Sequence, residues 1–356
     1  MTGKDELFSP YPPPPSCGAA SHEQFVDILT VISVIGVVFL HTNGVFWTHP
    51  SGRLWITSNI IESVFYYAVP VFFMVSGYTL MNFRDRYGVG QFFIKRFRRT
   101  VVPFFGWSTC IYIALVMFGQ VSEDSSFLLS VFNCSHFQIY WFFIPLFACY
   151  LSIPVLSLVM EKKTTFFYLA IYAFISYSIL PFLASRFNLL INPEIKVPIA
   201  GGYVLYLLLG FLAGHYHIKR CYRILIYIAG LVGLLLHCCM TIILSPDGMP
   251  INGLYKGYLN FPAVLYSLSV FVFCKYTNWD YLFINRFTNF CLGKLKQSSL
   301  GIYLTHGILV YYLVPYSAIP VSSIIYRTVG AVVIILLCSV FTLLLQRIPV
   351  VRQLVP

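Results

Sequence analysis

The chain has 356 residues, of which 58% are hydrophobic and 10% charged, and its formal net charge at pH 7 is +11. A soluble domain carries about 25% charged residues, so this chain has too few to cover a surface that faces water. Apolar runs of about 20 residues recur along it, which is the length of a helix that crosses a bilayer. Stretches of about ten residues with alternating polarity are not visible, which argues against an outer-membrane barrel. The predicted fold class is all-α, a polytopic bundle of membrane helices.

Breaks between the apolar runs predict about ten transmembrane helices. In chain order these cover 25–47, 59–82, 100–119, 139–160, 165–184, 199–217, 223–245, 257–276, 298–316 and 320–346. The first run is too long for a signal peptide and has no small-residue cleavage site. The proline-rich residues 1–23 are expected to form a disordered cytoplasmic tail and 347–356 a short second one, so the membrane domain spans 24–346.

The basic residues predict how the bundle is oriented. Most of the 23 Lys and Arg residues fall in loops on the side that also holds both ends of the chain. The loops on the opposite side contain Arg53, Arg186, Lys196 and Lys256. Because cytoplasmic loops carry an excess of Lys and Arg, both termini are expected in the cytoplasm.

His41 is the most informative polar residue of the first expected helix. It shares a helix face with Thr30 and Asp27, since 11 and 14 residues are about three and four turns. At about 1.5 Å per residue, it lies about 20 Å deeper in the membrane than Asp27. An ionisable group at that depth is costly and is a candidate for function. It either hydrogen-bonds between helices or acts as a general base, for which imidazole is suited because it titrates near neutral pH.

A basic cluster, Lys95-Arg96-Phe97-Arg98-Arg99, precedes the third expected helix. It could set the topology by binding anionic lipid headgroups. Alternatively it could bind the phosphates of a ligand, for which Arg is better suited than Lys. Arg96 and Arg99 are three residues apart and would project from one face at the start of a helix.

Other polar residues in the expected spans are predicted to make hydrogen bonds between helices; these are Glu62, His237, His306 and Arg327. Trp141 follows an outward loop and is expected at the membrane surface. Most cysteines lie in apolar runs, without a CxxC pair or a ligand-like Cys/His spacing. We therefore expect neither a disulfide framework nor a metal site.

Several stretches together resemble the acyltransferase 3 family of membrane acyltransferases, in their order and spacing. They are Asp27-Ile28-Leu29-Thr30 with His41, VPVFFMVSGY at 69–78, Arg96-Phe97-Arg98-Arg99 before Pro103, GGYVLYLLLGFLAG at 201–214 and SLGIYLTH at 299–306. The resemblance covers roughly residues 24 to 346. The details of the chain resemble the stand-alone branch typified by the enterobacterial-common-antigen O-acetyltransferase. It is also similar to the membrane part of the vancomycin-resistance serine racemases.

The resemblance implies a multi-pass enzyme of the bacterial cytoplasmic (inner) membrane. It would move an acyl group, expected to be acetyl, from cytoplasmic acyl-CoA to a hydroxyl of a cell-envelope glycan or a lipid-linked saccharide. Acetyl-CoA would be a co-substrate, without a permanently bound cofactor. Membrane lipids are further expected partners and nucleic acids are not, while the sequence carries no signal for an oligomeric state.

The resemblance also implies roles for individual residues. His41 would be the catalytic base, and Asp27 would tune or orient the site. Arg96, Arg98 and Arg99 would hold the CoA phosphates, with supporting roles for Ser76, Trp141, Tyr303 and His306. The family usually has Arg where this chain has Thr30. If that arginine helps to hold the acyl donor or to position the histidine, one of the three arginines would have to supply the charge; the alternative is that the chain has lost acyl-CoA chemistry.

Two questions of mechanism and class stay open at this stage. The acyl group could pass directly from the thioester to the acceptor, or through an acyl-histidine intermediate. A secondary transporter or exporter would share the hydrophobicity and the buried polar groups, although no internal repeat with broken helices is visible. A membrane module that binds an amino acid, like the racemase-linked relatives, is the third alternative.

Overall fold

The structure is a computed structural model, and it describes residues 19–121, 127–135, 137–192, 195–196 and 201–356. The secondary structure in these residues is helical, with short 3-10 and π turns between or within the helices. The α-helices are α1 (Ala19–Thr42), α2 (Gly52–Phe65), α3 (Ala68–Leu80), α4 (Val89–Arg96), α5 (Val102–Met117), α6 (Phe127–Phe132), α7 (Phe143–Leu156), α8 (Lys163–Phe174), α9 (Leu180–Phe187), α10 (Val204–His215), α11 (Arg220–Leu244), α12 (Phe261–Tyr276), α13 (Asp280–Ile284), α14 (Arg286–Ile308) and α15 (Ala331–Leu345). The all-α prediction is confirmed.

Seven segments of the described residues are long and apolar enough to cross a membrane, and α10 and α12 are shorter apolar helices. One of the seven, Gly52–Asp85, contains both α2 and α3. The expected span 298–316 is not among the seven; it falls in the second half of α14 and the π turn Leu309–Leu313. Large apolar side chains point outward along α11 and α15, which is the pattern of helices that face lipid. The chain is thus a polytopic helical bundle.

The ends of the expected membrane domain differ in detail from the sequence prediction. α1 begins at Ala19, after the proline run, so the last part of the expected tail 1–23 is helical, while 1–18 lie outside the described residues. The segment 347–356 is folded onto the bundle rather than free. It forms a 3-10 turn at Val351–Leu354, and the Trp107 indole of α5 donates a hydrogen bond to the Leu354 carbonyl at 3.0 Å.

Helix α3 packs against α10 in the middle of the bundle with almost no side chain between the two backbones. A Cβ on Gly210 would lie 2.0 Å from the Met74 carbonyl oxygen, and a Cβ on Gly77 would lie 2.1 Å from that of Leu207. Small residues allow membrane helices to approach this closely. The motif VPVFFMVSGY and the glycines of 201–214 therefore build the close packing of α3 against α10.

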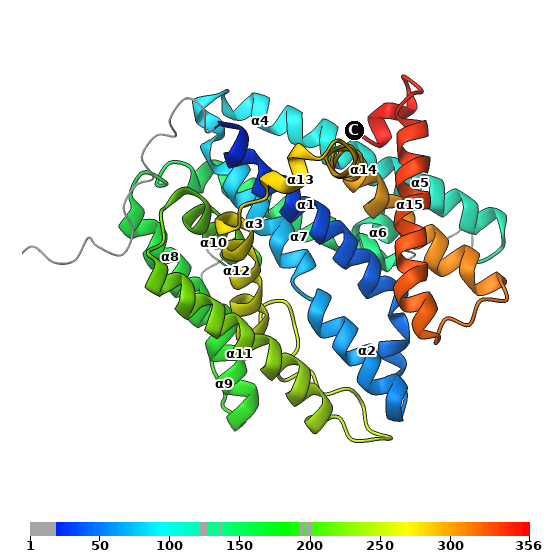
Figure 1. Cartoon of the computed structure of the whole chain (residues 1–356), viewed down its shortest axis with the longest axis horizontal. Helices are drawn as coiled ribbons and strands as arrows, with labels where there is room; N and C mark the ends of the chain where they lie inside the picture. The colour runs from blue at the N-terminus through cyan, green and yellow to red at the C-terminus, as the bar shows by residue number, and fades with distance from the viewer. Residues whose placement is uncertain (1–18, 122–126, 136, 193–194, 197–200) are drawn as a thin grey trace, which may run out of the picture.

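The two ends of α1 lie at opposite faces of the bundle (Figure 1). Its first turns lie near α4 and the N-terminal end of α14, on the face where the C-terminus is also found. Its last turns run toward the face that holds the start of α2 and the loop after α11. The single helix α1 therefore runs from one face of the bundle to the other.

Candidate functional site

His41 lies in the last turn of α1 and pairs with a tyrosine from the other end of the chain. Its Nδ1 is 2.8 Å from the Tyr311 hydroxyl, and their rings meet edge to face. Tyr311 belongs to the π turn that extends α14, so α14 brings it to α1. The helix ends just after His41, where the Asn43 side chain leaves the helix and donates to the Ser58 carbonyl of α2 at 2.8 Å. The imidazole is thus oriented from α14 while the neighbouring turn is held by α2.

His306 lies beside His41, with the ring centroids 5.1 Å apart. Its Nδ1 faces the Ile302 carbonyl of the same helix at 2.9 Å, so Nδ1 carries the proton and Nε2 is the bare nitrogen. The prediction of a hydrogen bond between helices was wrong for this residue, because its one bond stays within α14. Nε2 is buried and has no hydrogen-bond partner among the described residues. Two imidazoles therefore share this end of the bundle.

His41 lines a cavity of about 720 Å³, which we call the histidine cavity. That volume is in the range of small-molecule sites, roughly 300–1,000 Å³. Its walls are mostly aromatic, and they come from α1, α2, α3, α14, the loop before α7 and the loop before α12. The lining residues are Val37, Leu40, His41, Gly44, Trp47, Glu62, Tyr66, Val69, Ser135, Phe137, Gln138, Ile139, Trp141, Phe142, Tyr258, Tyr303, Tyr311 and Tyr312.

Two of the expected supporting residues belong to this cavity. Trp141 stacks on Tyr258 with the ring centroids 5.5 Å apart and an interplanar angle of 21°. The Tyr303 hydroxyl donates to the Ile139 carbonyl, which ties α14 to the turn before α7. Ser76 is different: its hydroxyl donates to the Phe72 carbonyl of its own helix, and it does not line the cavity.

A buried ion pair forms part of the same wall. Glu62 of α2 is buried, and its Oε1 lies 3.7 Å from Nζ of Lys256, which comes from the loop before α12. The Lys256 ammonium also lies 3.0 Å from Nε2 of His237. Burial lowers the pKa of Lys256 to about 8, and the Glu62 carboxylate opposes that shift. This pairing could not be predicted from the sequence, because Lys256 lies in a loop far along the chain.

Arg327 ties together the ends of three helices near His41, and its hydrogen bonds between helices agree with the sequence prediction. It is 2% exposed, and it donates to the Asn43 Oδ1 at 3.2 Å and to the Thr57 hydroxyl at 3.0 Å. Both partners accept hydrogen bonds, so the guanidinium is fixed without a carboxylate. It supports the turn that follows His41 rather than lining the cavity.

A second cavity, of about 1130 Å³, lies at the opposite face, and we call it the basic cavity. Its lining combines cationic and amide side chains from the π turn Phe97–Val101, the start of α5, α14 and the C-terminal end of the chain. The lining residues are Arg98, Arg99, Val102, Gly293, Lys296, Gln297, Leu300, Gln346, Arg352, Gln353, Val355 and Pro356. Two of the three arginines predicted to bind a donor are therefore in one site. Lys296 and Arg352 join them, and sequence reasoning missed both.

Arg96 does not line the basic cavity. Its guanidinium lies over the rings of Phe92 and Tyr150, 5.9 and 5.8 Å from their centroids. A π turn, Phe97–Val101, follows α4 directly, so the α-helical spacing that put Arg96 and Arg99 on one face does not apply. The structure groups Arg98 with Arg99 instead.

Asp27 lies at the edge of the basic cavity and not beside His41. Its Oδ1 is 2.6 Å from Nζ of Lys296, which lines that cavity. The 14 residues between Asp27 and His41 correspond to about 21 Å of helix, so the carboxylate is too far away to orient the imidazole. Tyr311 has that position instead. Thr30, where the resemblance expects Arg, donates to the Val26 carbonyl of its own helix at 2.8 Å.

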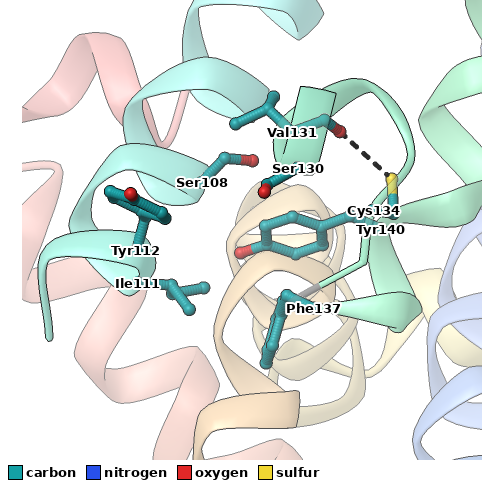
Figure 2. A pocket seen from close by; sticks show the side chains of 8 residues that line it. All are labelled: Ser108, Ile111, Tyr112, Ser130, Val131, Cys134, Phe137 and Tyr140. Atoms are coloured by element: carbon teal, nitrogen blue, oxygen red, sulfur yellow. Dashed lines mark hydrogen bonds between the residues drawn. The ribbon is translucent and has the colours of Figure 1, made fainter. Parts of the chain in front are cut away.

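A small pocket of about 20 Å³ adjoins the histidine cavity and shares Phe137 with it. Figure 2 shows its eight side chains, among them the Cys134 thiol, which donates to the Val131 carbonyl at 3.5 Å. The Tyr140 hydroxyl donates to the Leu304 carbonyl at 2.7 Å. This volume accommodates about one water molecule, which is too little for a substrate. The role of Tyr140 here is to hold α14 through its hydrogen bond to Leu304.

The described residues contain no cluster of three or more His, Cys, Asp or Glu side chains that could hold a metal ion. Their cysteines are all free thiols.

Comparison with known proteins identifies the family. Searches of curated proteins and of solved structures found no match to the chain. The model of a family described as an acyltransferase domain matches residues 23–343, which is most of the chain and includes the histidine cavity and part of the lining of the basic cavity. The chain therefore belongs to the acyltransferase 3 family and is a membrane acyltransferase.

Proposed function

We propose that the protein is an O-acetyltransferase that moves an acetyl group from acetyl-CoA, bound in the basic cavity, to a hydroxyl bound in the histidine cavity. The acceptor would be a cell-envelope glycan or its lipid-linked precursor. The observation that carries the proposal is the position of His41: it lines a cavity of substrate size at one end of α1, and the other end of α1 lies at the basic cavity.

The basic cavity suits the donor. Arg98, Arg99, Lys296 and Arg352 supply cationic donors for the phosphates of CoA, and Arg forms paired hydrogen bonds to phosphate. The excess of Lys and Arg on this face supports placing it in the cytoplasm, where acyl-CoA is made. Asp27 holds Lys296 at the cavity edge by its ion pair, so its proposed role is in the donor site and not in proton transfer.

The histidine cavity suits the acceptor and the reaction. When Nδ1 of His41 donates to the Tyr311 oxygen, Nε2 is free to accept a proton. Nε2 would take the proton of the acceptor hydroxyl as its oxygen bonds to the thioester carbonyl carbon. The carbon–sulfur bond then breaks, and the thiolate of CoA takes up the proton from the imidazolium. Binding of the phosphates in the basic cavity would position the thioester for this attack.

The test uses the full chain in lipid vesicles with radiolabelled acetyl-CoA. Lipid-linked saccharides extracted from bacterial membranes serve as acceptors, and label in the saccharide fraction is counted. The wild-type protein is expected to transfer label and His41→Ala to lose transfer by about 100-fold or more. Mass spectrometry of envelope glycans from cells with and without the gene identifies the acceptor. Full transfer by His41→Ala would rule out His41 as the base.

A further inference from the structure

One oxygen of the Glu62 carboxylate has no partner although it is buried in the wall of the histidine cavity. Oε1 faces Lys256 at 3.7 Å. Oε2 is buried and has no hydrogen-bond partner among the described residues; the Asn43 amide lies close to the carboxylate but donates to the Ser58 carbonyl. Glu62 lines the cavity together with His41, so a molecule bound there meets both side chains. A buried carboxylate oxygen without a donor is costly, and a hydrogen-bond donor that enters the cavity would remove that cost.

Lys256 holds the carboxylate in place but leaves Oε2 open. Its ammonium is itself fixed from several sides, with Nζ 4.4 Å from the Phe46 ring centroid and 4.6 Å from that of Tyr66. His237 accepts at 3.0 Å on a further side. The lysine therefore has little freedom to move round to Oε2. An ion pair that served packing alone would be expected to use both carboxylate oxygens.

Three stacked aromatic rings line the cavity next to the ion pair. Tyr66 stacks on Tyr258 with the centroids 4.3 Å apart at 13°, and Tyr258 stacks in turn on Trp141. All three rings line the cavity. Such a surface fits the apolar C–H face of a saturated ring whose hydroxyls point outward from its edge. A hydroxyl at that edge is a donor that could reach Glu62.

We propose that Glu62 selects acceptors that carry a second hydroxyl next to the one that is acylated. The reacting hydroxyl would face His41, the neighbouring hydroxyl would donate to Oε2 of Glu62, and the ring would lie against the aromatic stack. Glu62 is thus a substrate-binding group that fixes which hydroxyl reacts, and Lys256 is the residue that positions it. The inference rests on the proposed function, because it assigns the acceptor side of the same reaction.

The test compares two small probe acceptors that differ by one hydroxyl, cyclohexanol and trans-1,2-cyclohexanediol. The purified full chain in lipid vesicles is supplied with labelled acetyl-CoA, and kcat and KM are measured for each probe and for methyl hexopyranosides. The wild type is expected to prefer the diol by about tenfold or more in kcat/KM, as for one hydrogen bond to a charged group. The diol has two equivalent hydroxyls, so a preference of about twofold is the statistical baseline.

Glu62→Gln and Glu62→Met are expected to bring this preference down toward that baseline, chiefly by raising KM for the diol. Both are expected to keep transfer to cyclohexanol, which shows that each variant is folded and holds the donor. Glu161→Gln, which alters an exposed carboxylate after α7, is the matched control and should leave the preference unchanged. Lys256→Met should weaken the preference as well, because it removes the group that holds Glu62.

The outcomes separate this inference from the proposed function. A diol preference that persists in both Glu62 variants, or a wild type that does not discriminate between the probes, overturns the role of Glu62 and leaves the acetyltransferase proposal standing. A wild type that acylates none of the probes or hexosides, and releases no CoA with membrane-extracted saccharides, overturns both. If Glu62→Gln loses transfer to cyclohexanol as well as to the diol, Glu62 does more than bind the second hydroxyl, and the inference is contradicted.

Discussion

The Nδ1 of His41 and the hydroxyl of Tyr311 lie 2.8 Å apart, although 270 residues separate them in the chain. The Tyr311 side chain leaves the imidazole with one nitrogen for proton transfer and holds the ring at the cavity wall. The first prediction is that Tyr311→Phe lowers kcat about 10-fold to 100-fold while KM for acetyl-CoA stays unchanged. The phenyl ring keeps the shape of the side chain, so the loss reports the hydrogen bond.

The control for that measurement is Tyr168→Phe. Tyr168 is exposed on α8 and does not line the histidine cavity, so this variant should keep wild-type kcat. If Tyr311→Phe also kept wild-type kcat, the hydroxyl would have no part in orienting His41.

The route of the acyl group gives a second prediction. Direct transfer leaves no acyl group on the protein, so intact mass spectrometry after incubation with acetyl-CoA alone should find the unmodified mass. His41→Ala serves as the control for non-specific acetylation of lysines. An added acetyl group that is present in the wild type, absent from His41→Ala and released by an acceptor would establish the acyl-histidine route instead.

The donor site gives a third prediction, which distinguishes the arginines from one another. Arg98→Ala and Arg99→Ala should each raise KM for acetyl-CoA about tenfold, because each removes a charged donor from the basic cavity. Arg96→Ala should change this KM little, since its guanidinium packs on Phe92 and Tyr150. Added salt should weaken donor binding in the wild type and have less effect in the Arg98 and Arg99 variants.

Arg186→Ala is a suitable control, because this arginine lies in the last turn of α9 and does not line the basic cavity. An equal rise of KM in Arg96→Ala and Arg98→Ala would contradict the grouping seen in the structure. It would favour the original spacing argument, in which Arg96 and Arg99 share a face.

These cases show which parts of the site could be predicted from the sequence. Composition and apolar runs were enough for the membrane fold, and the polar stripe of α1 was enough to single out His41. The expectation that Arg96 and Arg99 share one face was wrong, because an α-helical spacing was applied to a segment that contains a π turn. A spacing argument depends on the local helix type, which the residues 97–101 do not reveal.

The partners of the site residues could not be predicted for a different reason. Tyr311, Lys256 and Lys296 reach His41, Glu62 and Asp27 through the packing of distant helices and loops. No periodic pattern within one helix signals such pairs. Asp27 and His41 do share a face of α1, but the sequence offered no means of telling that Asp27 pairs with a residue of the basic cavity while His41 lines the histidine cavity.

The ion pair of the histidine cavity gives a fourth prediction, on pH. The pKa of Lys256 is about 8 in the folded protein, lowered by burial from its usual 10.5. Below pH 8 the ammonium is charged and holds the Glu62 carboxylate; as the pH rises through 8 it loses its proton and the pair dissolves. The preference for the diol over cyclohexanol should therefore fall as the pH is raised from about 7 to 9.

Lys256→Met tests the origin of that pH dependence. Without a titrating group at this position, the preference should be low and nearly independent of pH over the same range. The preference is the ratio of kcat/KM for the two probes, so effects of pH on thioester hydrolysis or on the protonation of His41 act on both probes and cancel. A wild-type ratio that stays constant through pH 8 to 9 would show that Lys256 does not control Glu62.

The contact between α3 and α10 gives the last prediction. Gly210→Ala would place a Cβ 2.0 Å from the Met74 carbonyl oxygen, which belongs to the backbone and cannot turn away. The helices would have to separate, and overpacking of this kind typically costs about 1–3 kcal/mol or more. We expect a lower melting temperature in detergent and a smaller monodisperse fraction on size exclusion. Gly90→Ala in α4 has open space around it and should behave as the wild type. Because α3 also contributes Val69 to the histidine cavity, the Gly210→Ala protein that remains folded should lose more affinity for the acceptor probes than for acetyl-CoA, relative to the wild type.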